Sequence, residues 1–144
     1  MTIIIDHKPV RCDVFNSPLQ LKLCLEQNPN LLDSRMGSSI KIAGRDIAIP
    51  NIGTVDFLMI DEKGCPVFAL IDSDESFNET VGFIFCLASF LPRLSASFFN
   101  ECLNGNLLRV LESYNTNNDL WVKFSSHLRL NSARFFIVTN KTTK

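Results

Sequence analysis

The sequence predicts a mixed α/β domain, and three observations support that prediction. Between residues 40 and 72, short β-rich runs alternate with turn residues, as the strands of a meander do. Residues 76–104 are rich in Phe, Leu and Ala, and such long, continuous apolarity favours a helix. A last β-rich run covers Arg134–Thr139, so strands and helices are interleaved along one chain.

The first forty residues contain two short apolar runs and one leucine-rich segment. Thr2–Ile5 and residues 10–15 have the composition of strands. Ser17 and Pro18 then supply a helix N-cap and a first-turn proline. The leucines that follow end before Asn28, which predicts a first helix of about three turns.

The rest of the chain divides into three further strands and several helices. The predicted strands are Ile40–Ile49, 54–60 and 66–71, each joined to the next by a short turn. Pro92 lies within the apolar segment 76–104 and predicts a kink or a split there. Residues 107–114 and 120–130 predict two more short helices before the last strand.

Composition limits the classes of function. The 144 residues are enough for one domain, residues 1–144. Fourteen Lys and Arg against fifteen Asp and Glu give a net charge of −1, which excludes a polycationic nucleic-acid binder. The five cysteines lack zinc-finger spacing, so we expect buried free thiols in a reducing cytoplasm. The apolar run 81–91 is shorter than the roughly 20 residues a bilayer requires, so we expect no membrane span.

Residues 53–72 read GTVDFLMIDEKGCPVFALID, with an Asp inside one apolar strand and a second strand after a tight turn. Three further landmarks follow the same order along the chain: residues 25–32, 42–45 and 133–139. Together these segments resemble the PD-(D/E)XK, or restriction-endonuclease-like, nucleases, and the small RecB-type DNA endonucleases in particular. The resemblance covers residues 19–90 and 131–139. It implies a mixed sheet of three meandering strands plus a late strand, flanked by helices.

The resemblance also implies which positions should hold the chemistry. In that family an Asp on the second core strand and a Glu on the third bind Mg²⁺, and a nearby Lys steadies the nucleophile. Asp56 stands at the Asp position, but Leu70 replaces the Glu and Asp72 replaces the Lys. Phe83 stands near the position of a Gln in the following helix.

These departures predict a nuclease fold that has lost catalysis. Leu70 has no oxygen to coordinate a hard cation, and a carboxylate in place of a lysine reverses the local charge where phosphate should lie. Leu70 and Phe83 would instead extend the apolar core into the catalytic cleft. We therefore expect a pseudo-nuclease that acts in binding or assembly, with no catalytic residue, metal ion or other cofactor.

The alternative is a diverged Mg²⁺- or Mn²⁺-dependent endonuclease that uses acids from shifted positions. Its candidate catalytic residues are Asp56, Asp72, Lys41 and Arg45, and its candidate metal ligands are Asp56, Asp72, Asp74 and Glu75. Against this, the acids after the third strand are typical of a solvated helix entry. Asp56 equally suits a structural ion pair with Lys41 or Arg45 on the preceding strand.

Charge is distributed unevenly along the chain. Residues 56–79 contain seven acidic residues and one Lys, whereas residues 120–144 contain five basic residues and no acid. Contact with a nucleic-acid backbone is one interpretation, through Lys123, Arg129, Arg134 and Lys141. Two other interpretations are that opposite charges pair in a homodimer and that the charged residues are simply solvated. Both are favoured over contact with nucleic acid. A partner-binding subunit, based on the apolar surplus of residues 81–99, is a further alternative.

Overall fold

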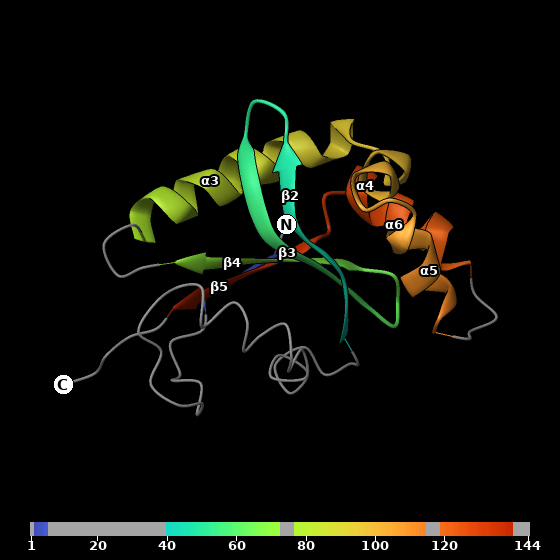
Figure 1. Cartoon of the computed structure of the whole chain (residues 1–144). Coiled ribbons are helices and arrows are strands. Elements are labelled where there is room, and N and C mark those ends of the chain that lie inside the picture. The colour runs from blue at the N-terminus through green and yellow to red at the C-terminus, as the bar shows by residue number, and fades with distance from the viewer. Residues whose placement is uncertain (1, 6–39, 73–76, 115–118, 140–144) are drawn as a thin grey trace.

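The computed structural model of the chain describes residues 2–5, 40–72, 77–114 and 119–139 (Figure 1). The fold is mixed α/β, as the sequence predicts. The strands are β1 (Thr2–Ile5), β2 (Ile40–Ile49), β3 (Gly53–Asp61), β4 (Pro66–Asp72) and β5 (Arg134–Thr139). The helices are α3 (Phe77–Phe90), the short 3₁₀ helix η2 (Leu91–Arg93), α4 (Ala96–Cys102), α5 (Asn106–Glu112) and α6 (Leu120–Arg129). The strand predicted at residues 10–15 and the helix predicted after Pro18 lie outside the described residues.

The strands form one five-stranded sheet in the order β1-β5-β4-β3-β2. Strands β2, β3 and β4 are a meander of antiparallel neighbours, which confirms the meander predicted for residues 40–72. Strand β5 runs parallel to both β4 and β1. A parallel neighbour requires a crossover connection, and the helices α3 to α6 lie in the chain between β4 and β5.

The long apolar segment divides at Pro92, as the sequence predicts. Helix α3 ends at Phe90, and Pro92 occupies the first turn of η2. A new helix, α4, then begins after Ser95, whose side chain accepts a hydrogen bond from the backbone N–H of Phe98 at 3.1 Å. A proline cannot donate a helical hydrogen bond, and a serine N-cap starts the next helix.

The main core lies between one face of the sheet and helices α3 to α6 (Figure 1). Its centre is aromatic: the Phe99 ring lies 5.8 Å from that of Phe68 and 6.1 Å from that of Phe124, centroid to centroid. The opposite face of the sheet is buried too, and its apolar side chains are Ile40, Phe57, Met59, Val67, Ala69, Phe136 and Val138. Burial on both faces explains why the strand sequences are almost continuously apolar.

Helix α5 and the residues that follow it hold the edge strand β2 and its neighbour β3. The ammonium of Lys41 donates to the backbone oxygen of Ser113 at 3.2 Å and to its Oγ at 2.9 Å, and lies over the Tyr114 ring. The Tyr114 hydroxyl donates to the Ile60 carbonyl, and Asn106 Nδ2 donates to the Ala43 carbonyl, both at 2.6 Å. These contacts cover an edge that would otherwise present unpaired backbone groups.

The described cysteines correct one expectation. Cys65, Cys86 and Cys102 are free thiols, but only Cys65 is buried. Cys86 and Cys102 are exposed because they lie on outward faces of α3 and α4. Within the described ranges, no single helix is both long and apolar enough to cross a membrane.

Replacing Phe99 by Ala should lower the free energy of unfolding by about 3–5 kcal/mol, because it opens a cavity at the centre of the aromatic core. Phe85 is 51% exposed on α3, so Phe85→Ala is the matched control and should change stability by about 0.5 kcal/mol or less. Urea unfolding measures both. Equal effects of the two substitutions would contradict this description of the core.

Candidate functional site

The site predicted around Asp56 lies where β3 separates from β4. The regular pairing of these strands ends with Phe57 opposite Ala69. Beyond that pair, the backbone N–H of Ile71 donates to Oδ2 of Asp56 at 2.7 Å. The half-buried Asp56 carboxylate therefore takes the place of a main-chain acceptor at the point where the ladder stops.

The tip of the β2–β3 hairpin leans onto helix α3 (Figure 1). Gly53, at the start of β3, has a φ of +144°, and a Cβ added there would lie 2.7 Å from Cε2 of Phe83. Phe83 is half-buried against the main core. Phe83, which stands near the position expected for a polar Gln, thus provides an apolar surface on which the hairpin tip packs.

Leu70 lies in the same core as Phe83. Its side chain is 5% exposed and belongs to the cluster that joins the sheet to helices α3 to α6. Leu70 and Phe83 thus both contribute to the main apolar core. Leu70 immediately precedes Ile71, the residue whose amide donates to Asp56.

The other predicted acids are only partly described. The main chain of Asp72 ends β4 and pairs with Thr139 of β5. Asp74 and Glu75 lie outside the described residues. Among the side chains that the structure describes, no group of three or more His, Cys, Asp or Glu is placed to hold a metal ion.

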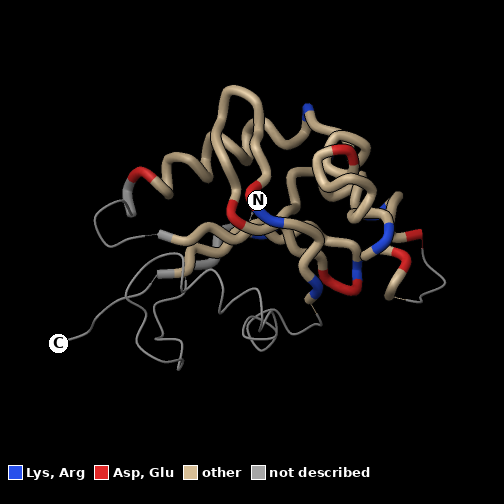
Figure 2. Tube along the Cα trace, viewed as in Figure 1, with Lys and Arg blue, Asp and Glu red and all other residues tan. Residues whose placement is uncertain are grey.

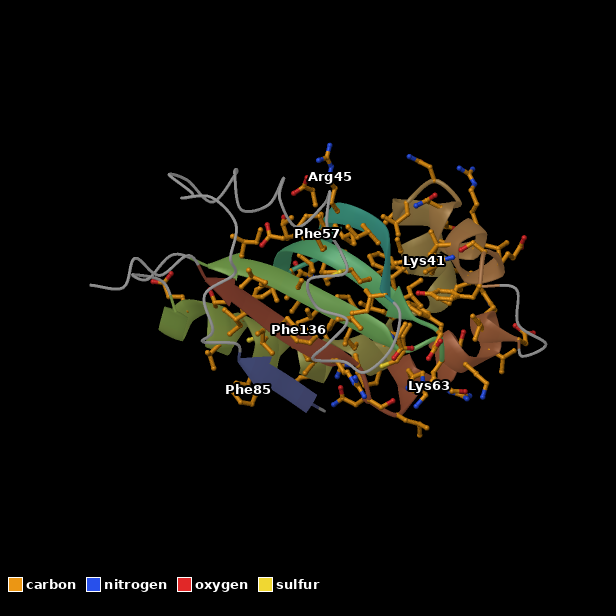
Figure 3. All side chains as sticks on the ribbon, turned by 90° about the horizontal axis from the view of Figure 1, so that it is seen from below. Lys41, Arg45, Phe57, Lys63, Phe85 and Phe136 are labelled. Atoms are coloured by element: carbon orange, nitrogen blue, oxygen red, sulfur yellow. The ribbon has the colours of Figure 1, made fainter. Side chains whose placement is uncertain are left out.

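The two predicted cations occupy different places on β2. Lys41 pairs with Ile60 in the ladder, and its ammonium is held by Ser113 and Tyr114. The Lys41 ammonium therefore contacts the residues that follow α5. Arg45 is exposed and lies opposite Phe57, the neighbour of Asp56 (Figure 3). The Asp56 carboxylate accepts a hydrogen bond from the Ile71 amide, a partner that sequence patterns do not reveal.

Replacing Asp56 by Ala should lower the free energy of unfolding by about 1–3 kcal/mol, because the Ile71 N–H loses its charged acceptor. Asp56→Asn keeps an acceptor oxygen and should cost less than the Ala substitution. Denaturant unfolding compares the two variants with the wild type. A fully neutral Asp56→Ala substitution would show that this hydrogen bond does not hold the strand junction.

A second polar cluster lies at the opposite end of β4, around the β3–β4 turn. Asp61 is 2% exposed, and its Oδ1 accepts the backbone N–H groups of Lys63 and Cys65, both at 2.9 Å. Gly64 adopts a φ of +78°, and a Cβ there would lie 3.1 Å from both the Leu120 carbonyl and the Lys123 Cβ. The buried carboxylate therefore shapes a turn that packs closely against the start of α6.

His127 connects this turn to the end of α6. Its Nδ1 lies 2.6 Å from the Ser132 hydroxyl, and the backbone of Lys63 lies near enough to the ring to influence its pKa. Burial lowers the pKa of the His127 imidazole; Lys123 and Arg134 act in the same direction, while Asp61 and the Lys63 backbone oppose them. His127 is thus a half-buried, hydrogen-bonded histidine.

Cys65 lies in the same cluster but lacks the properties of a nucleophile. Its Sγ donates to the Ser132 carbonyl at 3.4 Å. Burial, with a smaller contribution from Asp61, raises the pKa of the Cys65 thiol to about 11. The thiol is therefore protonated at neutral pH, and the thiolate is the reactive form. Sequence reasoning missed this cluster because its members are far apart in the chain; only the turn residues 61–64 gave a signal.

The lowered pKa of His127 predicts a pH-dependent stability. Below the ordinary pKa of 6.5, the unfolded chain binds a proton that the folded chain resists. The free energy of unfolding should therefore fall as the pH drops from about 7.5 to about 5.5. His127→Gln should flatten that slope, and urea unfolding at several pH values measures it. His7 is present in both proteins, so a slope that persists unchanged in the variant would contradict the assignment.

Comparison of the chain with protein-family models, with curated proteins and with solved structures finds no match in any of the three. Functional inference therefore rests on the two clusters themselves: the Asp56 junction at one end of β4 and the Asp61 turn at the other.

Proposed function

We propose that the chain is a non-catalytic domain of the PD-(D/E)XK, or restriction-endonuclease-like, fold: a pseudo-nuclease that acts in binding or assembly. The order of elements supports the proposal. Three meandering strands are followed by helices and then by a late strand parallel to the third. Asp56 lies on the second strand of the meander, and Leu70 and Asp72 lie on the third, where that fold has its catalytic residues.

The observation that carries the proposal is the contact between Asp56 and Ile71. The carboxylate oxygen Oδ2 accepts a backbone N–H at 2.7 Å, so part of the binding capacity of Asp56 is used within the fold. Mg²⁺ prefers oxygen ligands in a near-octahedral arrangement. Leu70, at the position of the second carboxylate, supplies none and is packed in the core. Among the described side chains, Leu70 and Ile71 therefore offer no oxygen that could join Asp56 at a Mg²⁺ ion.

The competing proposal is the diverged endonuclease, in which Asp72, Asp74 or Glu75 joins Asp56 at a Mg²⁺ or Mn²⁺ ion. It requires a second carboxylate close to Asp56. The described side chains place the amide of Ile71 there and put the Lys41 ammonium at Ser113. These contacts support the first proposal, whereas the side chains of Asp72, Asp74 and Glu75, which the second proposal requires, lie outside what the structure describes.

The purified chain should leave single- and double-stranded DNA and RNA uncut in the presence of Mg²⁺ or Mn²⁺. Gel analysis of labelled oligonucleotides over a long incubation measures this. Asp56→Ala is the control variant. Cleavage by the wild type that disappears in Asp56→Ala would establish the diverged endonuclease and overturn the pseudo-nuclease proposal.

A further inference from the structure

One side of helix α3 is apolar although it faces solvent. We define the α3 face as the exposed, uncharged residues Gly82, Phe85, Cys86 and Ser89. Phe85 is 51% exposed, and a Cβ added at Gly82 would meet no atom within 4 Å. In Figure 3 Phe85 lies at the edge of the molecule. The opposite side of the helix is packed in the main core through Ile84 and Leu87, so the α3 face is the side that a partner can reach.

The α3 face offers few groups for water to bind. No charged residue lies between Glu79 and Arg93 along the chain, and Figure 2 shows α3 without charge beyond its first turn. The Ser89 hydroxyl is used within the helix, because it donates to the Phe85 carbonyl at 2.9 Å. A surface helix normally carries charged residues on its outer side, whereas a helix that is apolar all round is typically buried. The composition therefore indicates that a partner covers this face.

Opposite charges lie at the two ends of the α3 face. Glu79–Arg93 is one helical segment, and it bends by 114° where α4 follows. Both end residues are exposed, and at 1.5 Å per residue they are about 21 Å apart along the axis. Alternating steps of three and four residues join the positions Glu79, Gly82, Cys86, Ser89 and Arg93. Such steps place residues on the same side of a helix, so the face and its two charges are continuous.

We propose that the α3 face is the interface of a homodimer, in which α3 packs antiparallel against the same helix of a second copy. A twofold axis lets one patch serve both copies. Cys86 lies seven residues from Glu79 and seven from Arg93. An axis beside Cys86 therefore brings Glu79 of each copy to Arg93 of the other.

Charge complementarity is the reason to choose a second copy as the partner. The antiparallel arrangement pairs each Glu79 with an Arg93 and sets the positive end of one helix dipole beside the negative end of the other. A parallel pair would place like charges together. The small side chains at Gly82 and Ser89 allow the two helix axes to approach to about 8 Å, the close end of the usual range. Phe85 would then lose much of its exposure to water.

A lipid surface is a less suitable partner for the α3 face. Helices that lie on membranes are rich in Lys and Arg on their polar side. Helix α3 contains no Lys or Arg, and the side opposite the α3 face is packed against the sheet and the other helices.

The inference names a second copy of this chain as the partner in the proposed assembly role, and it rests on that role. A contact made by one helix pair is at the small end of the usual interface range of about 1,200–2,000 Å². We therefore expect a weak dimer whose population depends on protein concentration. The assay needs neither nucleic acid nor metal, so assembly and cleavage are measured separately.

The test is sedimentation velocity of the full chain over about a hundredfold range of concentration, in which mass action should convert monomer into dimer. Gly82→Glu should weaken the dimer by about tenfold or more, because it puts a charge inside the contact. Gly82→Ala is the matched control. Both substitutions replace a helical glycine by a better helix former, but Ala leaves the face uncharged and should keep the dimer. Circular dichroism checks that each variant is folded.

Charge reversal tests the antiparallel arrangement. Glu79→Arg should weaken the dimer by about fivefold, because two ion pairs become two repulsions. Adding Arg93→Glu to that variant should restore the dimer. Glu101→Arg makes the same change in net charge at an exposed position on α4 and is the control that should leave the affinity nearly unchanged.

A thiol cross-linker tests the position of the axis. A short bismaleimide, which alkylates two thiols, should link two copies through Cys86. Cys86→Ser should remove the linked dimer. Cys102 is also an exposed free thiol, so Cys102→Ser is the matched control and should leave the linked dimer in place.

Four results would decide against one of the two proposals. A monomer at every concentration, or equal weakening by Gly82→Glu and Gly82→Ala, would overturn the inference. So would a linked dimer that persists in Cys86→Ser, or a double charge reversal that fails to restore association. A monomer that binds phosphatidylcholine vesicles would overturn it in favour of a membrane surface. Cleavage of DNA in Mg²⁺ by a chain that forms the dimer would instead overturn the proposed loss of catalysis alone.

Discussion

The hydrogen bond from the Ile71 amide to the Asp56 carboxylate is the contact on which the arrangement of the candidate site depends. It lies at the end of the β3–β4 ladder, where β3 turns with β2 towards α3 (Figure 1). A buried amide without an acceptor is costly, so the separation of the two strands requires a side-chain acceptor at this position. Asp56 supplies it, and the hairpin tip then packs through Gly53 against Phe83.

The same contact connects stability to the proposed loss of catalysis. The Asp56 carboxylate contributes to the strand junction through this hydrogen bond whether or not a metal binds beside it. Leu70 next to it contributes to the main core, and burying a leucine side chain is worth about 1.5–3 kcal/mol. In the account proposed above, the residues at the Asp56 junction stabilise the fold.

Local sequence patterns predicted most of the fold but little of the candidate site. Turn residues and apolar runs predicted the strands between residues 40 and 72 closely, and Pro92 predicted the break after α3. Partners across the sheet depend on tertiary packing, so the contacts of Lys41 with Ser113 and Tyr114 left no local signal. For the same reason the sequence did not predict that Cys86 and Cys102 are exposed. It also did not predict that Asp61, Cys65 and His127 lie in one cluster.

The most direct test of the central claim is a crystal of the chain soaked in Mn²⁺ and measured at a wavelength where manganese scatters anomalously. The account predicts no anomalous peak within about 2.0–2.6 Å of the Asp56 carboxylate, with Oδ2 bonded to the Ile71 amide and Leu70 beside it. A manganese peak bridging Asp56 and a second carboxylate would contradict it.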